Sequence, residues 1–347
     1  MANAKISNDE DREMTFTESG KLVRAGGKKQ FALNTIECML NITDLCNFKC
    51  SYCCNRNWRA GRTLDRDVLE QFLCDIGERR ASFYLLYILG GEPFLYRDID
   101  RLLFYVDKYI PNSKQIVFVT NGSILHKNIS LLKKYTSIID IKYLVSLHIE
   151  QIELDTYLEN LDNIHQKNNI QCKLLLSPGQ LDVAKKLHNR LKDIGIYMFA
   201  APVFDRNLHA PEYDAAELDF LRSFAESADT LLFHEYEDIH GVRHMEEYKK
   251  IDKNFSPEKF SYKGMFCAAG MNTLRLGPDG VVVPCFGFMR HGVKFDLKQR
   301  RLRDIPELNA PCICPDGRCN CELFLQTPKW REAADAPAWL LREGAQA

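Results

Sequence analysis

Apolar, strand-like runs alternate with amphipathic, helix-like runs through the first two thirds of this chain. The strand-like runs, rich in β-branched and aromatic residues, are Ile36–Thr43, Phe83–Leu89, Gln115–Thr120, Ile138–Leu147, Ile170–Leu176 and Ile196–Phe204. The helix-like runs are Leu64–Ile76 with Thr63 as N-cap, Ile99–Tyr109, Ile129–Tyr135, Leu154–Gln166, Leu181–Ile194 and Asp214–Ala228. Strands separated by helices predict an α/β fold with a parallel sheet and right-handed crossovers. Periodicity alone does not separate an open sheet from a barrel.

The composition changes after residue 228. Residues 229–263 are charged and aromatic without a clear period, which is typical of a connector, although their histidines, His234, His240 and His244, offer a second interpretation as the mouth of a substrate site. From about Phe266 onward Cys, Gly and Pro dominate, which indicates a loop-rich domain held by metal. We therefore expect a polar leader (1–30), an α/β domain (31–228), a connector (229–265) and a cysteine-rich C-terminal domain with its tail (266–347).

Composition excludes several classes of function. The 347 residues carry a net charge of −1 and are 46% hydrophobic, so the chain can build a core but has no basic field for nucleic acid. No segment approaches the roughly 20 apolar residues of a membrane span, and the polar N-terminus argues against a secretory signal. We expect a cytoplasmic protein with no nucleic-acid or membrane partner.

The 13 cysteines are many for such a protein. In a reducing compartment clustered cysteines bind metal more often than they form disulfides. Cys38, Cys74 and Cys172 stand singly in apolar runs and are expected to be buried core thiols. Most of the others gather near residue 50 and between residues 267 and 321.

The first cluster, Cys46, Cys50 and Cys53, has the spacing C-x3-C-x2-C directly after a predicted strand. Three thiolates do not fill a tetrahedral zinc site, but they can hold three irons of a [4Fe–4S] cube and leave the fourth iron open. Tyr52 adds an aromatic face. A zinc knuckle with a distant fourth ligand, or a chance grouping, is the alternative. Cys54 breaks the spacing and is left out of the ligand set.

Polar turns follow the next three strands. Gly90-Gly91-Glu92-Pro93 ends the second; its glycines permit close approach of a ligand, and Glu92 can accept from an ammonium group. An ordinary strand-ending turn with a solvated glutamate is the alternative. Asn121, in Thr-Asn-Gly, ends the third strand, and Ser146 ends the fourth. Asn-Gly is common in turns, and His148, after Ser146, is expected to be structural.

Together the cysteine loop and the GGEP turn resemble the signature of the radical S-adenosylmethionine (SAM) superfamily. The resemblance implies a partial (β/α)6 TIM-like barrel with its site at the carboxyl ends of the strands. It implies that the open iron chelates SAM, that one electron splits SAM into methionine and a 5′-deoxyadenosyl radical, and that an electron donor such as flavodoxin or ferredoxin is a partner. The cofactor-binding residues it implies are Tyr52, Gly90, Gly91, Glu92, Pro93, Asn121 and Ser146.

The C-terminal cysteines extend the resemblance. Cys267, Gly280 and Cys285 stand as C-x12-G-x4-C, with β-like runs Asn272–Leu276 and Val281–Pro284 around a turn. This is similar to the opening of SPASM and twitch auxiliary-cluster domains, but the following cysteines, Cys312, Cys314, Cys319 and Cys321, depart from the usual SPASM spacing. One auxiliary [4Fe–4S] cluster with two spare cysteines is the simplest interpretation. Two incompletely ligated clusters, or a zinc site, stay open.

The family resemblance, rather than any residue, suggests an oxidoreductase-like enzyme that abstracts hydrogen from a peptide, as ribosomal-peptide maturases do. The alternative is a small-molecule sugar or amino-sugar dehydrogenase or epimerase. An alternative of another class is a non-enzymatic iron–sulfur carrier. No catalytic side chain is assigned from the sequence.

Overall fold

The computed structural model describes most of the chain between residues 35 and 308. The described residues are 5–7, 13–16, 22–24, 35–53, 61–79, 81, 83–164, 170–203, 211–226, 233–237, 243–247, 263–264, 266–308, 312–315 and 329–330. Among these residues, every helix is too short or too polar to span a bilayer.

The centre of the molecule is a curved sheet. Within the described part of the chain it has nine strands in the order β15-β14-β13-β4-β5-β6-β7-β8-β9. Six consecutive parallel strands form its larger part: β4 (Thr35–Thr43), β5 (Phe83–Gly90), β6 (Ser113–Thr120), β7 (Asp140–Leu147), β8 (Ile170–Leu176) and β9 (Tyr197–Pro202). The α/β fold with a parallel sheet, consistent with a partial TIM-like barrel, is confirmed.

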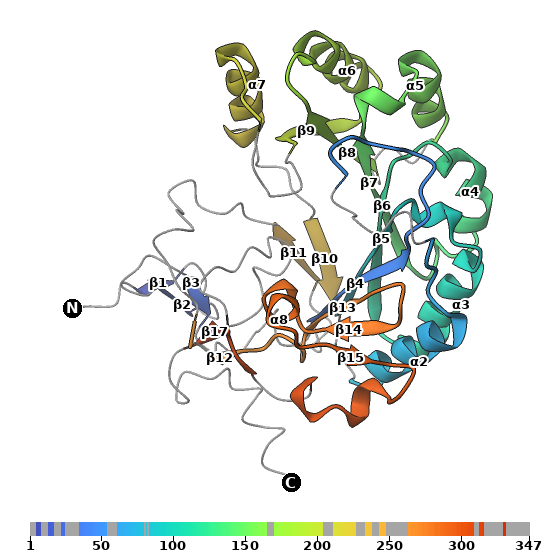
Figure 1. The fold of residues 1–347 in the computed structure, drawn as a ribbon, viewed down its shortest axis with the longest axis vertical. Helices are drawn as coiled ribbons and strands as arrows, with labels where there is room; N and C mark the ends of the chain where they lie inside the picture. The colour runs from blue at the N-terminus through green and yellow to red at the C-terminus, as the bar shows by residue number, and fades with distance from the viewer. Residues whose placement is uncertain are drawn as a thin grey trace.

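The helices lie in an arc outside this sheet (Figure 1). They are α2 (Arg66–Gly77), α3 (Ile99–Tyr109), α4 (Leu125–Leu132), α5 (Leu154–Asn163), α6 (Leu181–Asp193) and α7 (Ala215–Glu226). Short 3-10 turns η2 (Pro93–Leu95) and η3 (Ile149–Gln151) follow β5 and β7. Each crossover returns the chain to the same side, as right-handed βαβ units require.

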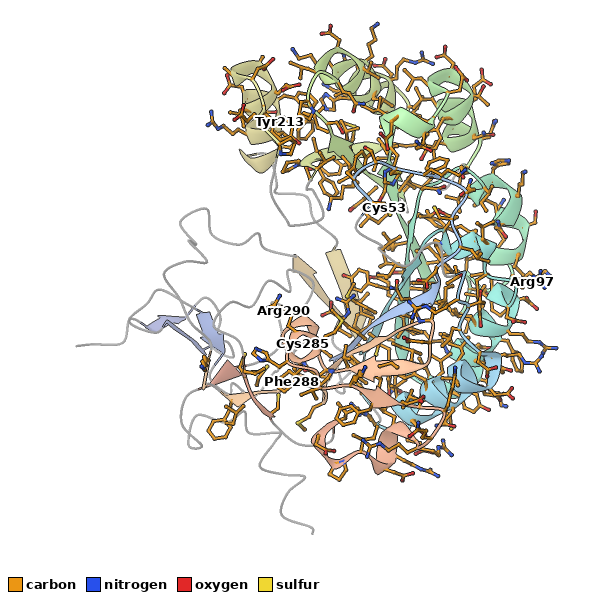
Figure 2. The ribbon with its side chains drawn as sticks, viewed as in Figure 1. Cys53, Arg97, Tyr213, Cys285, Phe288 and Arg290 are labelled. Atoms are coloured by element: carbon orange, nitrogen blue, oxygen red, sulfur yellow. The ribbon has the colours of Figure 1, made fainter. Side chains whose placement is uncertain are left out.

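Alternate residues of the central strands serve two different cores. On β4, Cys38 and Leu40 pack under the helices, whereas Met39 faces the opposite, inner side. The neighbouring strands repeat the pattern, with Tyr87 and Val117 on the inner side. Figure 2 shows Cys285 and Phe288 around helix α8 (Phe286–Arg290) on this inner side, and Arg97 at the outer edge.

The C-terminal region continues the same sheet. Strand β13 (Thr273–Leu276) pairs in parallel with β4, and β14 (Val281–Val283) and β15 (Phe295–Asp296) extend it antiparallel. The antiparallel β16 (Cys312–Ile313), β12 (Phe266–Cys267) and β17 (Lys329–Trp330) form a separate small sheet. The remaining elements are the 3-10 turns η5 (Leu302–Asp304) and η6 (Pro306–Leu308).

Two further groups of strands fall where the sequence indicated no elements. Strands β1 (Lys5–Ser7), β2 (Glu13–Phe16) and β3 (Leu22–Arg24) form an antiparallel sheet in the leader, and β10 (Phe233–Glu237) pairs with β11 (Arg243–Glu247) in the connector.

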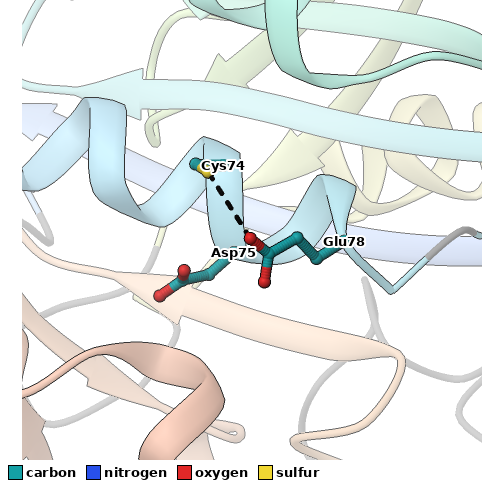
Figure 3. A group of neighbouring side chains, drawn as sticks. All are labelled: Cys74, Asp75 and Glu78. Carbon is teal, nitrogen blue, oxygen red and sulfur yellow. Dashed lines mark hydrogen bonds between the residues drawn. The ribbon is translucent and has the colours of Figure 1, made fainter.

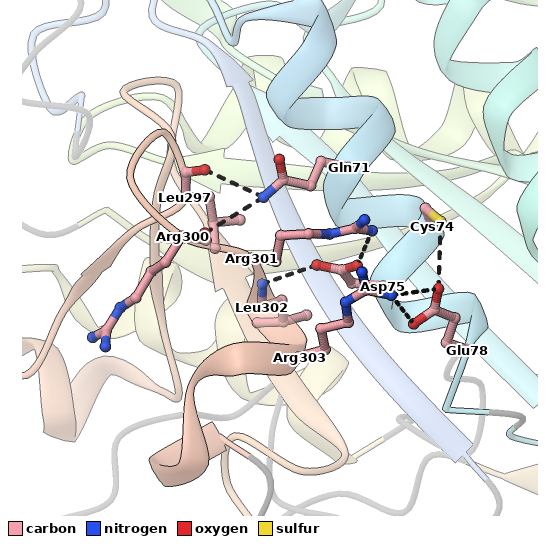
Figure 4. Close-up of polar contacts among 9 residues, drawn as sticks. All are labelled: Gln71, Cys74, Asp75, Glu78, Leu297, Arg300, Arg301, Leu302 and Arg303. Atoms are coloured by element: carbon pink, nitrogen blue, oxygen red, sulfur yellow. Dashed lines mark hydrogen bonds and ion pairs between the residues drawn. The ribbon is translucent and has the colours of Figure 1, made fainter.

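Helix α2 fixes the C-terminal region to the outer layer through charged groups. The Asp75 carboxylate, fully buried, pairs with the Arg301 guanidinium and accepts from the backbone N of Leu302 at 2.9 Å. Figure 3 shows Asp75 beside Cys74 and Glu78, a trio of metal-ligand types. Figure 4 shows that Arg301 and Arg303 occupy the two carboxylates, so an ion-pair network accounts for this trio.

Two helix starts predicted from the sequence were wrong. Asp65, not Thr63, caps α2, because its Oδ1 accepts from the backbone N of Asp67 and Val68, whereas Thr63 bridges to Thr43 beside the sheet. Helix α4 begins at Leu125 rather than at residue 129, because the buried Leu125 packs into the outer core.

Cys74 is half-buried, not a core thiol, since its Sγ lies 3.8 Å from the Glu78 carboxylate.

Candidate functional site

Several chemically active side chains follow the carboxyl ends of neighbouring parallel strands. Cys46 follows β4, Glu92 follows β5, Asn121 follows β6, and His148 follows β7. Because these strands are adjacent and parallel, their ends meet at one edge of the sheet. The sequence placed its candidate residues at this edge, and the structure brings them together.

The two glycines of the GGEP turn fit against the stem of the cysteine loop. A Cβ on Gly90 would lie 2.3 Å from the Thr43 carbonyl oxygen, and one on Gly91 would lie 2.2 Å from that of Leu45. The backbone N of Gly91 donates to Thr43 O at 2.8 Å, and that of Glu92 donates to Leu45 O at 2.7 Å. The missing side chains therefore allow the turn to hydrogen-bond to the segment that carries Cys46.

Glu92 is buried and accepts three hydrogen bonds from the protein. Its Oε1 accepts from Thr120 Oγ1 at 2.7 Å and from the backbone N of Phe94 at 3.2 Å, and its Oε2 accepts from the backbone N of Asn121 at 2.8 Å. Burial raises its pKa, and these three donors oppose that shift. In this structure the carboxylate joins the ends of β5 and β6, with Pro93 opening the short helical turn that follows.

Asn121 lies between the end of β6 and the cysteine loop. Its Nδ2 donates to Asn47 Oδ1 at 3.0 Å and lies 3.9 Å from Cys46 Sγ, while its Oδ1 accepts from the Ser123 hydroxyl at 2.6 Å. Tyr157 of α5 donates to its backbone oxygen at 2.6 Å. This side chain thus holds the start of the loop.

The segment after β7 holds the middle of the same loop, and sequence reasoning missed this. His148 Nδ1 lies 3.1 Å from the Tyr52 hydroxyl, with the two rings stacked. Glu150 accepts from the backbone N of Ser51 at 2.6 Å and from its hydroxyl at 3.0 Å. Gln151 Oε1 accepts from the backbone N of Lys49 at 3.0 Å. The sequence signal, a polar run His-Ile-Glu-Gln after a strand, is too common to have identified these partners.

The three loop thiols form a donor set that suits an iron–sulfur cluster. Cys46, Cys50 and Cys53 are all half-buried and reduced. The pKa of the Cys50 thiol is raised to about 12, first by burial and then by the negative charges of Glu150, Cys53 and Cys46. Soft thiolates that raise one another's pKa in this way favour a bound cation, and three of them leave a four-iron cube with one open position.

A basic side chain lies on the inner face beside this edge. Ser146 of β7 is in register with Lys173 of β8, which is in register with Phe199 of β9. Ser146 and Lys173 are half-buried and stand at positions that alternate with residues of the outer core, whereas the half-buried Phe199 packs against that outer core. Ser146 was predicted from the sequence, whereas Lys173 was read there as part of an apolar strand.

Four C-terminal cysteines come together on the inner side of the sheet. Cys267 and Cys312 are paired residues of β12 and β16, and Cys285 and Cys314 pack with them over Met39 and Tyr87. The pKa of the Cys312 thiol is raised, first by its hydrogen bond with Cys267 and by burial, then by the charges of its three cysteine neighbours. Four cysteine thiolates are the number of ligands that a closed tetrahedral ion or a fully ligated cube requires. Cys319 and Cys321 lie outside the described residues.

Comparison with known proteins identifies the class. Residues 40–196 match the Radical SAM superfamily, so this part of the chain is a radical SAM domain, a class of enzyme domain that binds a [4Fe–4S] cluster and SAM. A GTP 3′,8-cyclase of Staphylococcus saprophyticus is 34% identical over 97 residues, which are 26% of this chain and 28% of that protein. A similar enzyme of Stenotrophomonas maltophilia is 29% identical over 93 residues, again 28% of its length. The chain therefore spans less than a third of these two curated relatives.

Two solved structures share the fold over most of the chain. Streptococcus suis SuiB bound to S-adenosylmethionine has a TM-score of 0.51 and 17% identity, over 77% of this chain and 64% of SuiB. The protein anSMEcpe, with bound AdoMet and the Kp18Cys peptide, has a TM-score of 0.55 and 14% identity, over 79% of this chain and 80% of its own. At this identity the likeness concerns the fold.

Proposed function

We propose that this chain is a radical SAM enzyme that abstracts a hydrogen atom from a carbon of a peptide substrate. The observation that carries the proposal is the loop of Cys46, Cys50 and Cys53, held by the ends of β5, β6 and β7 within a segment that matches the Radical SAM superfamily. When bound and reduced, a [4Fe–4S] cluster supplies the electron that cleaves SAM to methionine and a 5′-deoxyadenosyl radical.

Different residues of the chain bind the cluster and the separate parts of SAM. Cys46, Cys50 and Cys53 hold three irons. The turn Gly90-Gly91-Glu92-Pro93 holds the loop stem through the backbone N of Gly91 and Glu92 and offers the Glu92 carboxylate to the ammonium group of SAM. Ser146 offers a hydroxyl to the ribose of SAM. The Lys173 ammonium offers a positive partner to the carboxylate of SAM, since Lys173 and Ser146 are neighbours in register on the inner face. Tyr52 and Asn121 act chiefly through the loop, by their contacts with His148 and with Cys46 and Asn47.

For the C-terminal domain we propose a SPASM- or twitch-like auxiliary [4Fe–4S] cluster on Cys267, Cys285, Cys312 and Cys314. Support comes from the convergence of these four thiols over the apolar inner face. Hydrogen abstraction leaves an unpaired electron on the substrate carbon, and a cluster there can accept it when the product is oxidised. Cys319 and Cys321, predicted as ligands from the sequence, are then not needed for a single cube.

The peptide substrate is supported by two solved structures that share the fold, because SuiB is described with its precursor peptide SuiA and anSMEcpe with the Kp18Cys peptide. The competing proposal is a small-molecule dehydrogenase or epimerase. Incubation with candidate peptides deuterated on side-chain carbons distinguishes the two, since transfer of deuterium into 5′-deoxyadenosine identifies the peptide as hydrogen donor. A sugar that transfers deuterium while the peptides do not would favour the rival.

The enzymatic class is tested by anaerobic reconstitution with iron and sulfide, followed by dithionite and SAM. We expect 5′-deoxyadenosine from the wild-type protein and from Cys74→Ser, a matched control outside both thiol groups, and none from Cys50→Ser. A wild-type protein that binds SAM without cleaving it would support an iron–sulfur carrier instead.

Iron counting tests the auxiliary site. In a Cys46/Cys50/Cys53→Ala triple variant we expect about four irons to remain, the content of one cube. If zinc is found instead of iron, the site cannot accept an electron and its metal is structural.

A further inference from the structure

The cysteine loop receives its shape from a segment on a different strand. Between Cys46 and Cys53, the backbone N of Lys49, the backbone N and hydroxyl of Ser51, and the Tyr52 hydroxyl all bond to side chains of residues 148–151. Phe48 adds an edge-on contact with the His148 ring, at 6.0 Å between centroids. Residues 148–151, including the turn η3, are here called the β7 platform.

The platform's bonds are directed at backbone groups that the loop cannot satisfy by itself. Within the described loop, the backbone bond between its own residues is from Cys53 N to Cys50 O, at 3.3 Å, together with a contact of Phe48 N with Cys46 Sγ. Short loops with so few internal bonds adopt many conformations, and each ordered residue costs about 1–2 kcal/mol of entropy. An external partner is therefore needed to fix the spacing of the thiols.

Glu150 is the charged acceptor of the platform, and its bonds lie at the exposed surface. Its two carboxylate oxygens bond separately to the amide and hydroxyl of Ser51, the residue next to Cys50. Hydrogen bonds to an ionised group are roughly twice as strong as neutral ones.

We propose that Glu150 is a positioning residue that pre-forms the cysteine loop before metal arrives, and that the β7 platform as a whole is the template on which the three thiols are spaced. Glu150 does not touch the metal in this role. It acts through Ser51, and Gln151 and His148 act in the same way through Lys49 and Tyr52. The part of this inference that concerns iron rests on the proposed function, whereas the part that concerns loop order does not.

The test compares backbone amide exchange by NMR in the metal-free full chain. We expect Glu150→Ala to speed exchange of the Ser51 amide by about tenfold, the loss of one hydrogen bond to a charged acceptor. Glu150→Gln keeps an acceptor for the amide and should change the rate much less. Glu153→Gln is the matched control: three residues away, it removes the same charge, but Glu153 caps α5 at Thr156.

Iron uptake is then measured on the same proteins, with far-UV circular dichroism to confirm that each is folded. We expect Glu150→Ala to load iron at the N-terminal site several times more slowly, and Glu153→Gln to load like the wild type. Unchanged Ser51 exchange in folded Glu150→Ala would overturn the proposal. If exchange speeds up as expected but the wild type takes up no iron at this loop, the proposed function fails and the positioning role stands.

Discussion

Gly91 has no room for one more carbon atom, because a Cβ there would lie 2.2 Å from the Leu45 carbonyl oxygen. We expect Gly91→Ala to lower the free energy of unfolding by about 1–3 kcal/mol, the usual cost of overpacking, and to reduce iron bound by the first three cysteines. Gly179→Ala is the control: its positive φ costs about 1 kcal/mol, but the position is open and distant in the chain. Equal iron content in the two variants would contradict this role of Gly91.

His148 is expected to stay neutral at ordinary pH. Burial lowers its pKa to about 4, and the Glu150 charge opposes the shift only in part. Because an unfolded histidine has a pKa near 6.5, the unfolded chain takes up this proton first. Its contribution to stability is therefore present above pH 6.5 and is lost as the pH falls toward 4. NMR titration of the histidine Cε1–H signals, with His148→Asn for assignment, checks this; a midpoint near 6.5 would show an exposed ring.

At the residue scale, the sequence indicated candidate ligands but not the residues that hold them in place. Cys46, Cys50 and Cys53 could be proposed as ligands because metal ligands have characteristic spacings. Glu150 and Gln151 were missed because their partners are about 100 residues away in the chain, and a hydrogen bond to a backbone amide leaves no residue pattern. Glu92 was proposed from the sequence as a partner of an ammonium group, and the structure adds contacts that the sequence did not show, with Thr120, Asn121 and Phe94.

At the scale of elements, the docking of α2 depends on one buried carboxylate. Asp75→Asn keeps an acceptor for the Leu302 amide but removes the charge that pairs with Arg301. We expect the free energy of unfolding to fall by about 2 kcal/mol, measured by urea denaturation. Glu78→Gln, which removes a surface pair with Arg303 at 3.2 Å, should cost less than about 1 kcal/mol. Similar losses of unfolding free energy in both variants would show that the buried Asp75–Arg301 pair stabilises the chain no more than the surface pair does.

The parallel strands could be predicted because strands buried on both faces are continuous apolar runs. Helix boundaries were harder, as the caps of α2 show: Thr63 and Asp65 are both good N-cap residues, and the choice depends on Thr63 pairing beside β4. The strands of the leader and the connector are only three to five residues long, too short for alternation of polar and apolar residues to indicate a strand.

At the scale of the whole molecule, the two halves of the chain share one sheet and one outer core. Leu274, Leu276 and Val282 of the C-terminal strands pack in the same core as Leu69 and Phe72 of α2. The buried Arg79 guanidinium also donates to the carbonyl oxygens of Gly270, at 2.7 Å, and Leu308, at 3.2 Å. The amino-acid composition therefore changes between the α/β domain and the cysteine-rich C-terminal domain, but the sheet continues across that boundary.

Truncation tests this continuity. A chain of residues 1–263 would leave β4 as an edge and expose apolar side chains that β13 and β14 now cover, so we expect aggregation in size-exclusion chromatography. The matched control is the full chain with Cys267, Cys285, Cys312 and Cys314 changed to Ser, which loses the thiols but keeps the strands and should remain monodisperse. A soluble, folded truncated chain would refute the shared core.

The alternation along β4 has a further consequence for metal selectivity. Cys38 lies under the helices with no exposed surface, one residue from Met39, which packs against the four C-terminal thiols. A slip of this strand by a single position would exchange the two sides and offer a fifth sulfur ligand to the proposed auxiliary cluster. Correct pairing of β4 with β5 and β13 therefore keeps the Cys38 thiol away from the four C-terminal cysteines. Molecules with a shifted register would be recognised by an abnormal amount of bound metal per chain.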